Sequence, residues 1–236
     1  MRVGVLGLAA IFSLAQAAPT WAQDHLFPDP GVFGEPDDFL VHVRLVFAQA
    51  FEEGVLLRAV VIPSFEKEYA VGLRETAKGC EVFLLTPSTQ IWNTELIRDY
   101  ERGNQRCYVN GKPLPLEDDK NYQRLKANNP SDYQHIHVTR QSRPVPKDLA
   151  DNLRHLWNER LLEVKDSDEL DGLDGETYYF SLSDAGRVPV SGHIWSPKPD
   201  SKAGRLVAVV PTLADFASGK ADAARLAAQI ELATKK

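Results

Sequence analysis

The sequence predicts an α+β fold, in which antiparallel hairpins form a sheet that helices cover on one face. Three observations indicate this class. Short segments rich in β-branched and alternating apolar residues are separated by turn residues, a long amphipathic segment covers residues 146–164, and an alanine-rich tail follows. The chain shows no internal repeat and no long low-complexity linker, so we expect residues 39–236 to form a single α+β domain.

The strands are expected mainly in pairs. Residues 39–47 alternate apolar with other side chains, which predicts a half-buried strand. Residues 54–62 form a dense run with several β-branched residues, which favours a central strand. Further hairpins are expected between residues 69–73 and 80–86 around Gly79, at Asn110-Gly111, and between residues 176–182 and 188–195.

The clearest helix is predicted over residues 146–164. Pro146 suits the first helical position and Asp148 the first turn, where a negative charge is favoured. One apolar stripe follows, formed by Leu149, Leu153, Leu156, Trp157, Leu161 and Val164. Other helical segments are expected at 88–102, with Trp92, Leu96 and Tyr100 on one face, at 117–128 as a helix or a surface loop, and at 221–233. Residues 205–217 contain Pro211, which either kinks one helix or opens a second helix after a short strand.

The first 17 residues have the order of features found in secretory signal peptides. Arg2 precedes an apolar run from Val3 to Leu14, and Ala15-Gln16-Ala17 forms a small-x-small cleavage site. We expect cleavage after Ala17, with Ala22 as the alternative, and an extended, proline-containing lead-in over residues 18–38. The run is shorter than the roughly 20 apolar residues of a spanning helix, which disfavours an uncleaved anchor. The mature protein is therefore expected in the periplasm or outside the cell, without a stable membrane span.

The charge balance argues against nucleic acid as a partner. Removal of residues 1–17 takes Arg2 away, so the net charge falls from -6 to -7 against an unchanged 33 acidic residues. Nucleic-acid affinity comes largely from basic side chains that neutralise phosphates, and this chain has no basic block.

Cys80 and Cys107 are the only cysteines in the chain. An even pair in an oxidising compartment is normally bridged, so we predict a disulfide between them. Closing this loop would be worth roughly 3 kcal/mol in the chain-entropy model. The long separation between the two residues does not fit a Cys-x-x-Cys redox motif.

His135 and His137 are the candidate metal ligands. In an extended segment their side chains would emerge from the same face and could contact one ion. A catalytic zinc site usually needs a third protein ligand, and no residue stands at a spacing that identifies it. A solvated pair of histidines, with Ile136 buried on the other face, is the favoured interpretation, and no cofactor is expected.

The acidic segment after the long helix is a candidate calcium site. An EF-hand register with Gly172 in the sixth position places Tyr178 where a bidentate glutamate is required, so this motif fails. A nonstandard calcium site at Asp168, Asp171 and Asp174 stays open beside a solvated loop.

Motifs for other chemistry are missing from the sequence. There is no Gly-x-Ser-x-Gly elbow and no glycine-rich phosphate loop. A carboxylate pair for glycoside hydrolysis stays open, because only the spatial separation of the two groups identifies such a pair. The sequence therefore favours a binding protein over an enzyme.

The segments Leu173-Asp-Gly-Glu-Thr-Tyr-Tyr-Phe180 and Gly192-His-Ile-Trp-Ser-Pro197 form a recognisable pattern. It resembles a pattern in uncharacterised secreted or periplasmic proteins of bacteria and covers roughly the last third of the chain. The resemblance implies no activity. The residues themselves predict a structural hairpin, with Asp174-Gly175 in a turn and with Tyr178 and Phe180 on one face.

We expect a secreted or periplasmic, non-catalytic protein that binds another envelope or secreted protein, as an inhibitor or an immunity-like protein does. An acidic protein of this kind suits a basic partner. Two alternatives stay open. One is a metal-assisted envelope hydrolase that uses His135 and His137, and the other is a carrier whose pocket is lined by Trp92, Tyr178 and Trp195.

Overall fold

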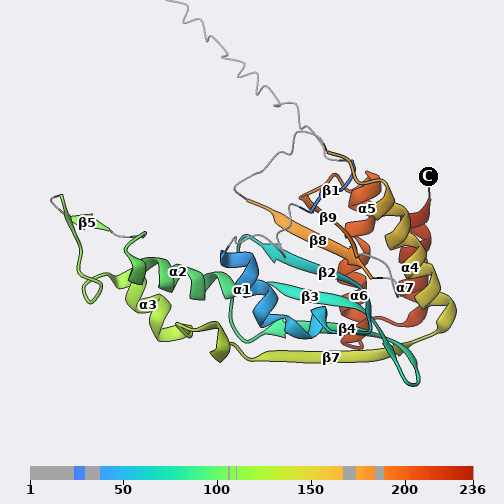
Figure 1. The fold of residues 1–236 in the computed structure, drawn as a ribbon, viewed down its shortest axis with the longest axis horizontal. Coiled ribbons are helices and arrows are strands. Elements are labelled where there is room, and N and C mark those ends of the chain that lie inside the picture. The colour runs from blue at the N-terminus through green and yellow to red at the C-terminus, as the bar shows by residue number, and fades with distance from the viewer. Residues whose placement is uncertain are drawn as a thin grey trace, which may run out of the picture.

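The computed structural model describes residues 24–29, 38–105, 107–109, 111–166, 174–183 and 189–235 (Figure 1). Its centre is a seven-stranded antiparallel sheet in the order β1-β9-β8-β2-β3-β4-β7. The strands are β1 (Phe27–Pro28), β2 (Val55–Pro63), β3 (Tyr69–Thr76), β4 (Gly79–Pro87), β7 (Val138–Val145), β8 (Glu176–Leu182) and β9 (Val190–Trp195). The predicted α+β class with an antiparallel sheet is confirmed.

The helices divide between the two faces of the sheet and an extension beyond it. They are α1 (Asp38–Val46), η1 (Ala48–Phe51), α2 (Ile91–Arg102), α3 (Lys120–Asn128), η2 (Tyr133–His135), α4 (Lys147–Leu162), α5 (Lys202–Val207), α6 (Val209–Ala217) and α7 (Ala223–Thr234). Helices α4 to α7 cover one face, where they share a core with alternate residues of β2, β3 and β8. In Figure 1, α6 lies behind the strands and α1 crosses in front of them.

The front face carries a second, smaller core. Val43 and Phe47 pack there with Val60 and Phe83 of the sheet. Because both of its faces are covered, β2 is buried along most of its length. This explains why its sequence is a dense apolar run rather than a strict alternation, as predicted for a central strand.

The strand predicted over residues 39–47 is wrong, because this segment forms α1. Leu40, Val43 and Phe47 are buried, whereas Val41 and Leu45 are exposed. A strand would have placed Val41, Val43 and Leu45 on the same side. The apolar residues of this segment fit both the two-residue period of a strand and the 3.6-residue period of a helix. The segment forms a helix, which covers the sheet.

Two predicted hairpins have glycine where a left-handed backbone is needed. Gly79 adopts φ 119° between β3 and β4, and Gly111 adopts φ 75° in the short hairpin of β5 (Tyr108–Val109) and β6 (Lys112–Pro113). Glycine reaches these angles without steric cost. The hairpin of β8 and β9 is also present.

The pattern in the last third of the chain is explained by packing. A Cβ atom on Gly175 would lie 2.3 Å from Ser196 Oγ and 2.7 Å from Trp195 Nε1, so the turn needs glycine. Tyr178 and Phe180 share one face, as predicted, and their rings stack with centroids 6.3 Å apart. These residues form a structural hairpin against the core.

Several predictions about segment boundaries need adjustment. Residues 24–29 of the predicted lead-in belong to the sheet, because Phe27 pairs with His193 of β9. Pro211 lies in the first turn of α6, and a helix, α5, replaces the short strand considered before it. In α2 the buried residues include Ile91 and Ile97, so the face predicted through Trp92 is not the buried one.

The long helix α4 provides a test of the main core. Leu153 is fully buried in its predicted stripe, whereas Leu162 near the end of the same helix is 71% exposed. We expect Leu153→Ala to lower the free energy of unfolding by about 2–5 kcal/mol, because the substitution leaves a cavity. Leu162→Ala is the matched control and should change it little. Chemical denaturation of both variants checks this, and equal effects would contradict the packing of α4.

Candidate protein-binding surface

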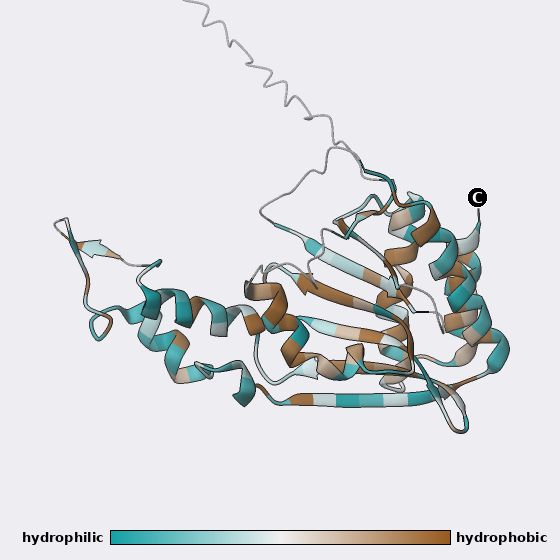
Figure 2. Cartoon of the chain, viewed as in Figure 1, coloured by the Kyte–Doolittle hydropathy of each residue, from teal (hydrophilic) through white to brown (hydrophobic). Residues whose placement is uncertain are grey.

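Helix α1 is apolar on two sides. Its buried residues face inward, and a second set recurs with helical spacing on the outer side: Val41 and Leu45 of α1, continued by Ala48 at the start of η1. Leu45 is 62% exposed and Val41 is 37% exposed. Figure 2 shows hydrophobic colouring over much of α1 on the front of the molecule. A helix at the surface of a soluble protein usually has a single apolar stripe.

The outer side of α1 borders a groove of about 370 Å³. We call its lining the α1 surface, which consists of Val41, Arg44, Leu45, Ala48 and Phe51. Burial of a valine or leucine side chain is worth about 1.5–3 kcal/mol. The α1 surface therefore holds binding energy that the fold itself does not use.

An aromatic ring between two arginines closes one end of the α1 surface. The guanidinium carbon of Arg58 lies 4.1 Å from the centroid of the Phe51 ring, and that of Arg44 lies 5.2 Å from it. Burial, followed by the nearby charge of Arg44, lowers the pKa of Arg58 to about 10. Arg58 is therefore charged at neutral pH, and both arginines contact the Phe51 ring by cation–π interaction.

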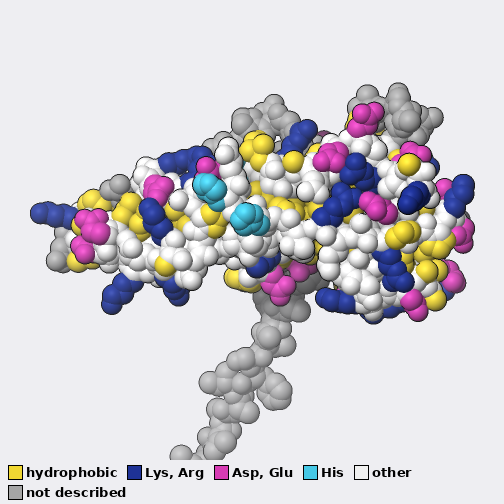
Figure 3. Space-filling model, turned by 90° about the horizontal axis from the view of Figure 1, so that it is seen from below, with side chains coloured by type: hydrophobic (Ala, Val, Ile, Leu, Met, Phe, Trp, Pro, Cys, Tyr) yellow, Lys and Arg dark blue, Asp and Glu magenta, His cyan; other side chains and the backbone are white. Residues whose placement is uncertain are grey.

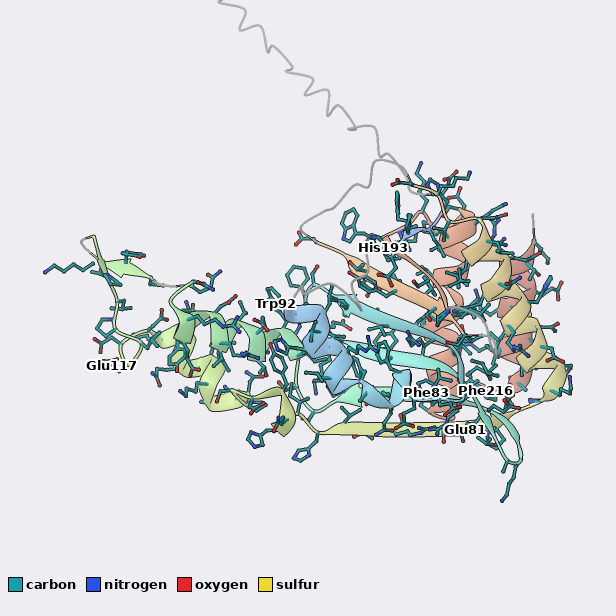
Figure 4. All side chains as sticks on the ribbon, viewed as in Figure 1. Glu81, Phe83, Trp92, Glu117, His193 and Phe216 are labelled. Carbon is teal, nitrogen blue, oxygen red and sulfur yellow. The ribbon has the colours of Figure 1, made fainter. Side chains whose placement is uncertain are left out.

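Exposed aromatic residues also lie near the start of α2, close to the first turn of α1. Trp92 is 41% exposed and meets the ring of Phe39 edge-on, with centroids 4.9 Å apart. Phe65, in the turn after β2, is 77% exposed. Gln90 donates a hydrogen bond to the carbonyl of Glu66, which ties that turn to α2. Figure 4 places Trp92 beside the first turn of α1.

A buried carboxylate fixes the start of α2. Glu68 is 1% exposed and accepts hydrogen bonds from the backbone N–H groups of Ile91 (2.7 Å) and Trp92 (3.0 Å). Burial raises the pKa of Glu68, although these hydrogen bonds oppose the shift. The neighbouring Gln90 provides no side-chain cap, so a residue distant in sequence supplies it.

A polar network joins α1, α2 and η2. His42 Nδ1 lies 3.2 Å from a carboxylate oxygen of Glu95, and Arg98 lies 3.1 Å from His42 Nε2. Tyr133 donates a hydrogen bond to Glu95 and stacks on His42 with ring centroids 3.9 Å apart. Since arginine can only donate, Nε2 accepts and Nδ1 carries the proton. Both ring nitrogens of His42 are thus engaged in holding the helices together.

The segment from α2 to α3 forms an arm that extends away from the sheet (Figure 1). Its two helices are tied by Glu101, which accepts hydrogen bonds from Tyr122 (2.9 Å) and Lys126 (3.0 Å). The hydrogen bond from Lys126 is the main reason that the pKa of Glu101 is lowered. At the tip of the arm, Tyr108 and Val109 are exposed.

The two histidines predicted as metal ligands lie on the surface. His135 ends η2 and His137 precedes β7, so the segment is not the continuous strand assumed in the prediction. Both side chains are exposed and Ile136 between them is buried. Figure 3 shows two histidine side chains on the face seen from below. Among the described residues, no group of three or more His, Cys, Asp or Glu is arranged to hold a metal ion.

The predicted disulfide is wrong, because Cys80 and Cys107 are free thiols. Cys80 is the second residue of β4 in the sheet, whereas α2 carries the chain away from the sheet before Cys107 is reached. Burial, followed by the charge of Glu75, raises the pKa of Cys80. A hydrogen bond with Asp119 raises the pKa of Cys107. Both groups are therefore kept in the thiol form.

Of the two remaining predicted sites, the structure describes only the residues of the possible ligand pocket. Asp168 and Asp171 of the possible calcium site lie outside the described residues, so that site stays a prediction. Tyr178 belongs to the core beneath α4 to α7, whereas Trp92 lies beside α1 on the opposite face. Together with Trp195 they cannot line one pocket.

Comparison with known proteins adds no relative. No family model, curated protein or solved structure matches the chain. Within the part of the chain that the structure describes, no helix has the length and apolar character needed to cross a bilayer. The α1 surface would have been visible in the sequence as Val41, Leu45 and Ala48, if residues 39–47 had been assigned to a helix.

The cap on α2 predicts a pH-dependent stability. The folded state raises the pKa of Glu68 above its ordinary value of 4.5, so it holds this proton more tightly than the unfolded chain does. The contribution of Glu68 to stability is therefore complete below about pH 4.5 and is lost as the pH rises through the folded pKa. We therefore expect the difference in free energy of unfolding between the wild type and Glu68→Gln to decrease as the pH rises from about 4.5 through the folded pKa of Glu68.

Glu66→Gln, at an exposed neighbouring position, is the matched control. Chemical denaturation at a series of pH values measures the free energy of unfolding of the wild type relative to each of the two variants. A relative stability of the wild type that increases with pH would contradict the role given to burial of Glu68.

Proposed function

We propose that this protein is a secreted or periplasmic, non-catalytic binding protein that docks another envelope or secreted protein on its α1 surface. The observation that supports the proposal is the second apolar stripe of α1, with Leu45 62% exposed beside a groove of about 370 Å³. Exposed apolar surface of this kind marks interaction sites on soluble proteins.

The form of the stripe suits a helix of the partner. Val41 and Leu45 of α1 and Ala48 of η1 lie on one side, so they form a ridge that a second helix can pack against. Trp92 packs edge-on against Phe39 in the first turn of α1, and tryptophan is among the residues that contribute most to binding energy when buried in an interface. The partner is therefore expected to present an amphipathic helix.

The site is held in shape before binding. The hydrogen bonds of His42 with Glu95 and Arg98 fix α1 relative to α2, and Glu68 fixes the first turn of α2. A preformed surface loses less conformational entropy when a partner binds. This favours a docking role for the α1 surface over a role as a hinge.

Charge is expected to influence the rate of association more than the stability of the complex. The acidic balance would attract a basic partner over a distance. The centre of the α1 surface is apolar, so contacts there should be insensitive to salt once formed. We expect added salt to slow association with little effect on dissociation.

The signal peptide predicted over residues 1–17 supports placement of this activity outside the cytoplasm. A small binding protein in that location acts as an inhibitor, an immunity-like protein or an adaptor for its partner. The resemblance of residues 173–180 and 192–197 to a pattern in uncharacterised secreted bacterial proteins, which is a prediction from sequence, agrees with this location.

Leu45→Glu tests the proposal, because it places a charge in the middle of the apolar stripe. Leu162→Glu is the matched control, since Leu162 is exposed on α4 away from this surface. Tagged mature forms of the wild type and of both variants are incubated with an envelope extract of the native organism. We expect one protein to be retained by the wild type and by Leu162→Glu and to be lost from Leu45→Glu.

Calorimetry with that protein in purified form then measures the affinity. The dissociation constant should rise at least about 30-fold for Leu45→Glu, as expected at an interface hot spot. Equal binding by Leu45→Glu and the wild type, with both folded, would show that the partner docks elsewhere. Retention of no protein by the wild type would count against a protein-binding role.

A further inference from the structure

The sheet ends in a long open edge at β7. This strand runs along the lower border of the sheet in Figure 1, and its outer side has no neighbouring strand among the described residues. Thr139, Gln141 and Ser142 are exposed, uncharged and polar. Figure 3 looks at the molecule from this side and shows uncharged surface beside the two histidines.

The direction of the backbone groups along β7 can be deduced from two observations. The carbonyl of His137 accepts a hydrogen bond from the N–H of Ser88. The backbone N–H and C=O groups of odd-numbered residues in β7 therefore point toward β4. Pro144 is paired with Glu81 and has no N–H to donate to β4. This agrees with backbone N–H and C=O groups of even-numbered residues that point away from β4. The free edge therefore offers the N–H and C=O groups of Val138, Arg140 and Ser142.

The two arginines of β7 do not shield this edge. Long charged side chains on an edge strand commonly prevent pairing with other chains. Here Arg140 turns back over the sheet, where it forms an ion pair of 2.6 Å with Glu81 and lies over the ring of Phe83. Figure 4 labels both of these residues on the sheet.

Arg143 is turned onto the opposite face. It donates a hydrogen bond of 3.0 Å to the carbonyl of Ala221 and lies over the ring of Phe216. Both arginines thus fasten β7 to the molecule and leave its outer backbone accessible.

We propose that β7 pairs with β7 of a second copy of this chain, forming a symmetric dimer with one continuous antiparallel sheet. In an antiparallel pair related by a two-fold axis normal to the sheet, the axis passes through a residue position. With the axis at Gln141, Arg140 lies opposite Ser142 of the second copy, and the two residues exchange both backbone hydrogen bonds. Thr139 lies opposite Arg143 of the second copy.

This register brings no like charges opposite each other and places the proline near the end of the paired segment. With the axis at Arg140, two arginines would face each other, which is destabilising. With the axis at Ser142, Arg140 would lie opposite Pro144 of the second copy, which has no N–H to donate. With the axis at Thr139, only residues 138–140 of the strand would be paired, against 138–144 with the axis at Gln141. The sequence of β7 is therefore self-complementary over most of its length when the axis lies at Gln141, and this favours a second copy over an unrelated strand. The inference does not depend on the α1 surface.

The first test measures the mass of the mature wild-type protein by analytical ultracentrifugation over a range of concentrations. We expect a reversible dimer. Ser142→Pro removes an outward N–H without affecting the bonds to β4, and each dimer then loses two hydrogen bonds. The dissociation constant should rise roughly 10- to 100-fold. Ser142→Ala, which keeps the N–H, is the matched control and should dimerise like the wild type.

A second test does not depend on the folding of the proline variant. Gln141 would lie opposite its own copy in a non-hydrogen-bonded pair, where Cα atoms are about 4.5 Å apart and a disulfide can form. Gln141→Cys, in a background of Cys80→Ser and Cys107→Ser, should cross-link into a covalent dimer under mild oxidation. Thr139→Cys on the same strand is the matched control and should remain uncross-linked, because it faces Arg143 of the second copy.

The proposal is overturned if the wild type is a monomer at all concentrations, including the case in which a strand of a different protein occupies the edge. It is also overturned if the wild type dimerises but Gln141→Cys does not cross-link, or if both cysteine variants cross-link equally. Loss of dimerisation in Ser142→Pro with normal binding of a partner at the α1 surface would separate this interface from the proposed function.

Discussion

Burial of β2 on both of its faces is the constraint from which the rest of the architecture follows. Ala59 and Val61 point toward the helices that follow β7, and Val60 points toward α1. A strand with apolar side chains on both sides must be covered on both sides. The C-terminal helices provide one cover, and α1 with η1 provides the other. The segment that forms α1 is therefore helical because it has to cover the apolar front face of the sheet.

This division gives the two layers different properties. The layer of α4 to α7 is thick, and its helices are amphipathic with a single buried stripe each. The front layer consists of little more than α1, η1 and the start of α2, so α1 has the sheet on one side and no helix of the described chain over its outer stripe. The polar network around His42 and the cap from Glu68 compensate for the small size of this layer, because directional bonds position helices that have few packing partners.

The parts of the fold that were predictable from sequence have local causes. The apolar stripe of α4, the dense run of β2 and the glycines of two hairpins depend on neighbouring residues, and each is found where predicted. The assignment of residues 39–47 failed because a nine-residue apolar segment satisfied both periods, and only the sheet beneath it decides between them. The prediction of a Cys80–Cys107 disulfide failed for a similar reason. It was based on an oxidising compartment and an even number of cysteines, and neither reveals that α2 leads the chain away from the sheet between the two residues.

The candidate site was less predictable than the fold. His135 and His137 were conspicuous in sequence but are surface residues at a turn, whereas Glu68 and Glu95 were inconspicuous and are buried. A carboxylate that caps a helix distant in sequence leaves no local pattern, and neither does an edge strand whose arginines are folded inward. Such features depend on which strands are neighbours, and strand order was not available from the pattern of hydrophobic residues.

The connection between β4 and β7 has a consequence for how related chains can differ. Pro87 pairs with Val138, so the two strands that flank the arm meet directly at its base. In topological terms the arm is the loop of an enlarged hairpin, and the sheet has the same register whatever the length of that loop. Insertion, truncation or replacement between the end of α2 and the start of α3 leaves all seven strands in order and spares Arg98 and Tyr133 of the polar network. The outer arm can therefore diversify rapidly during evolution while the body that carries it stays constant.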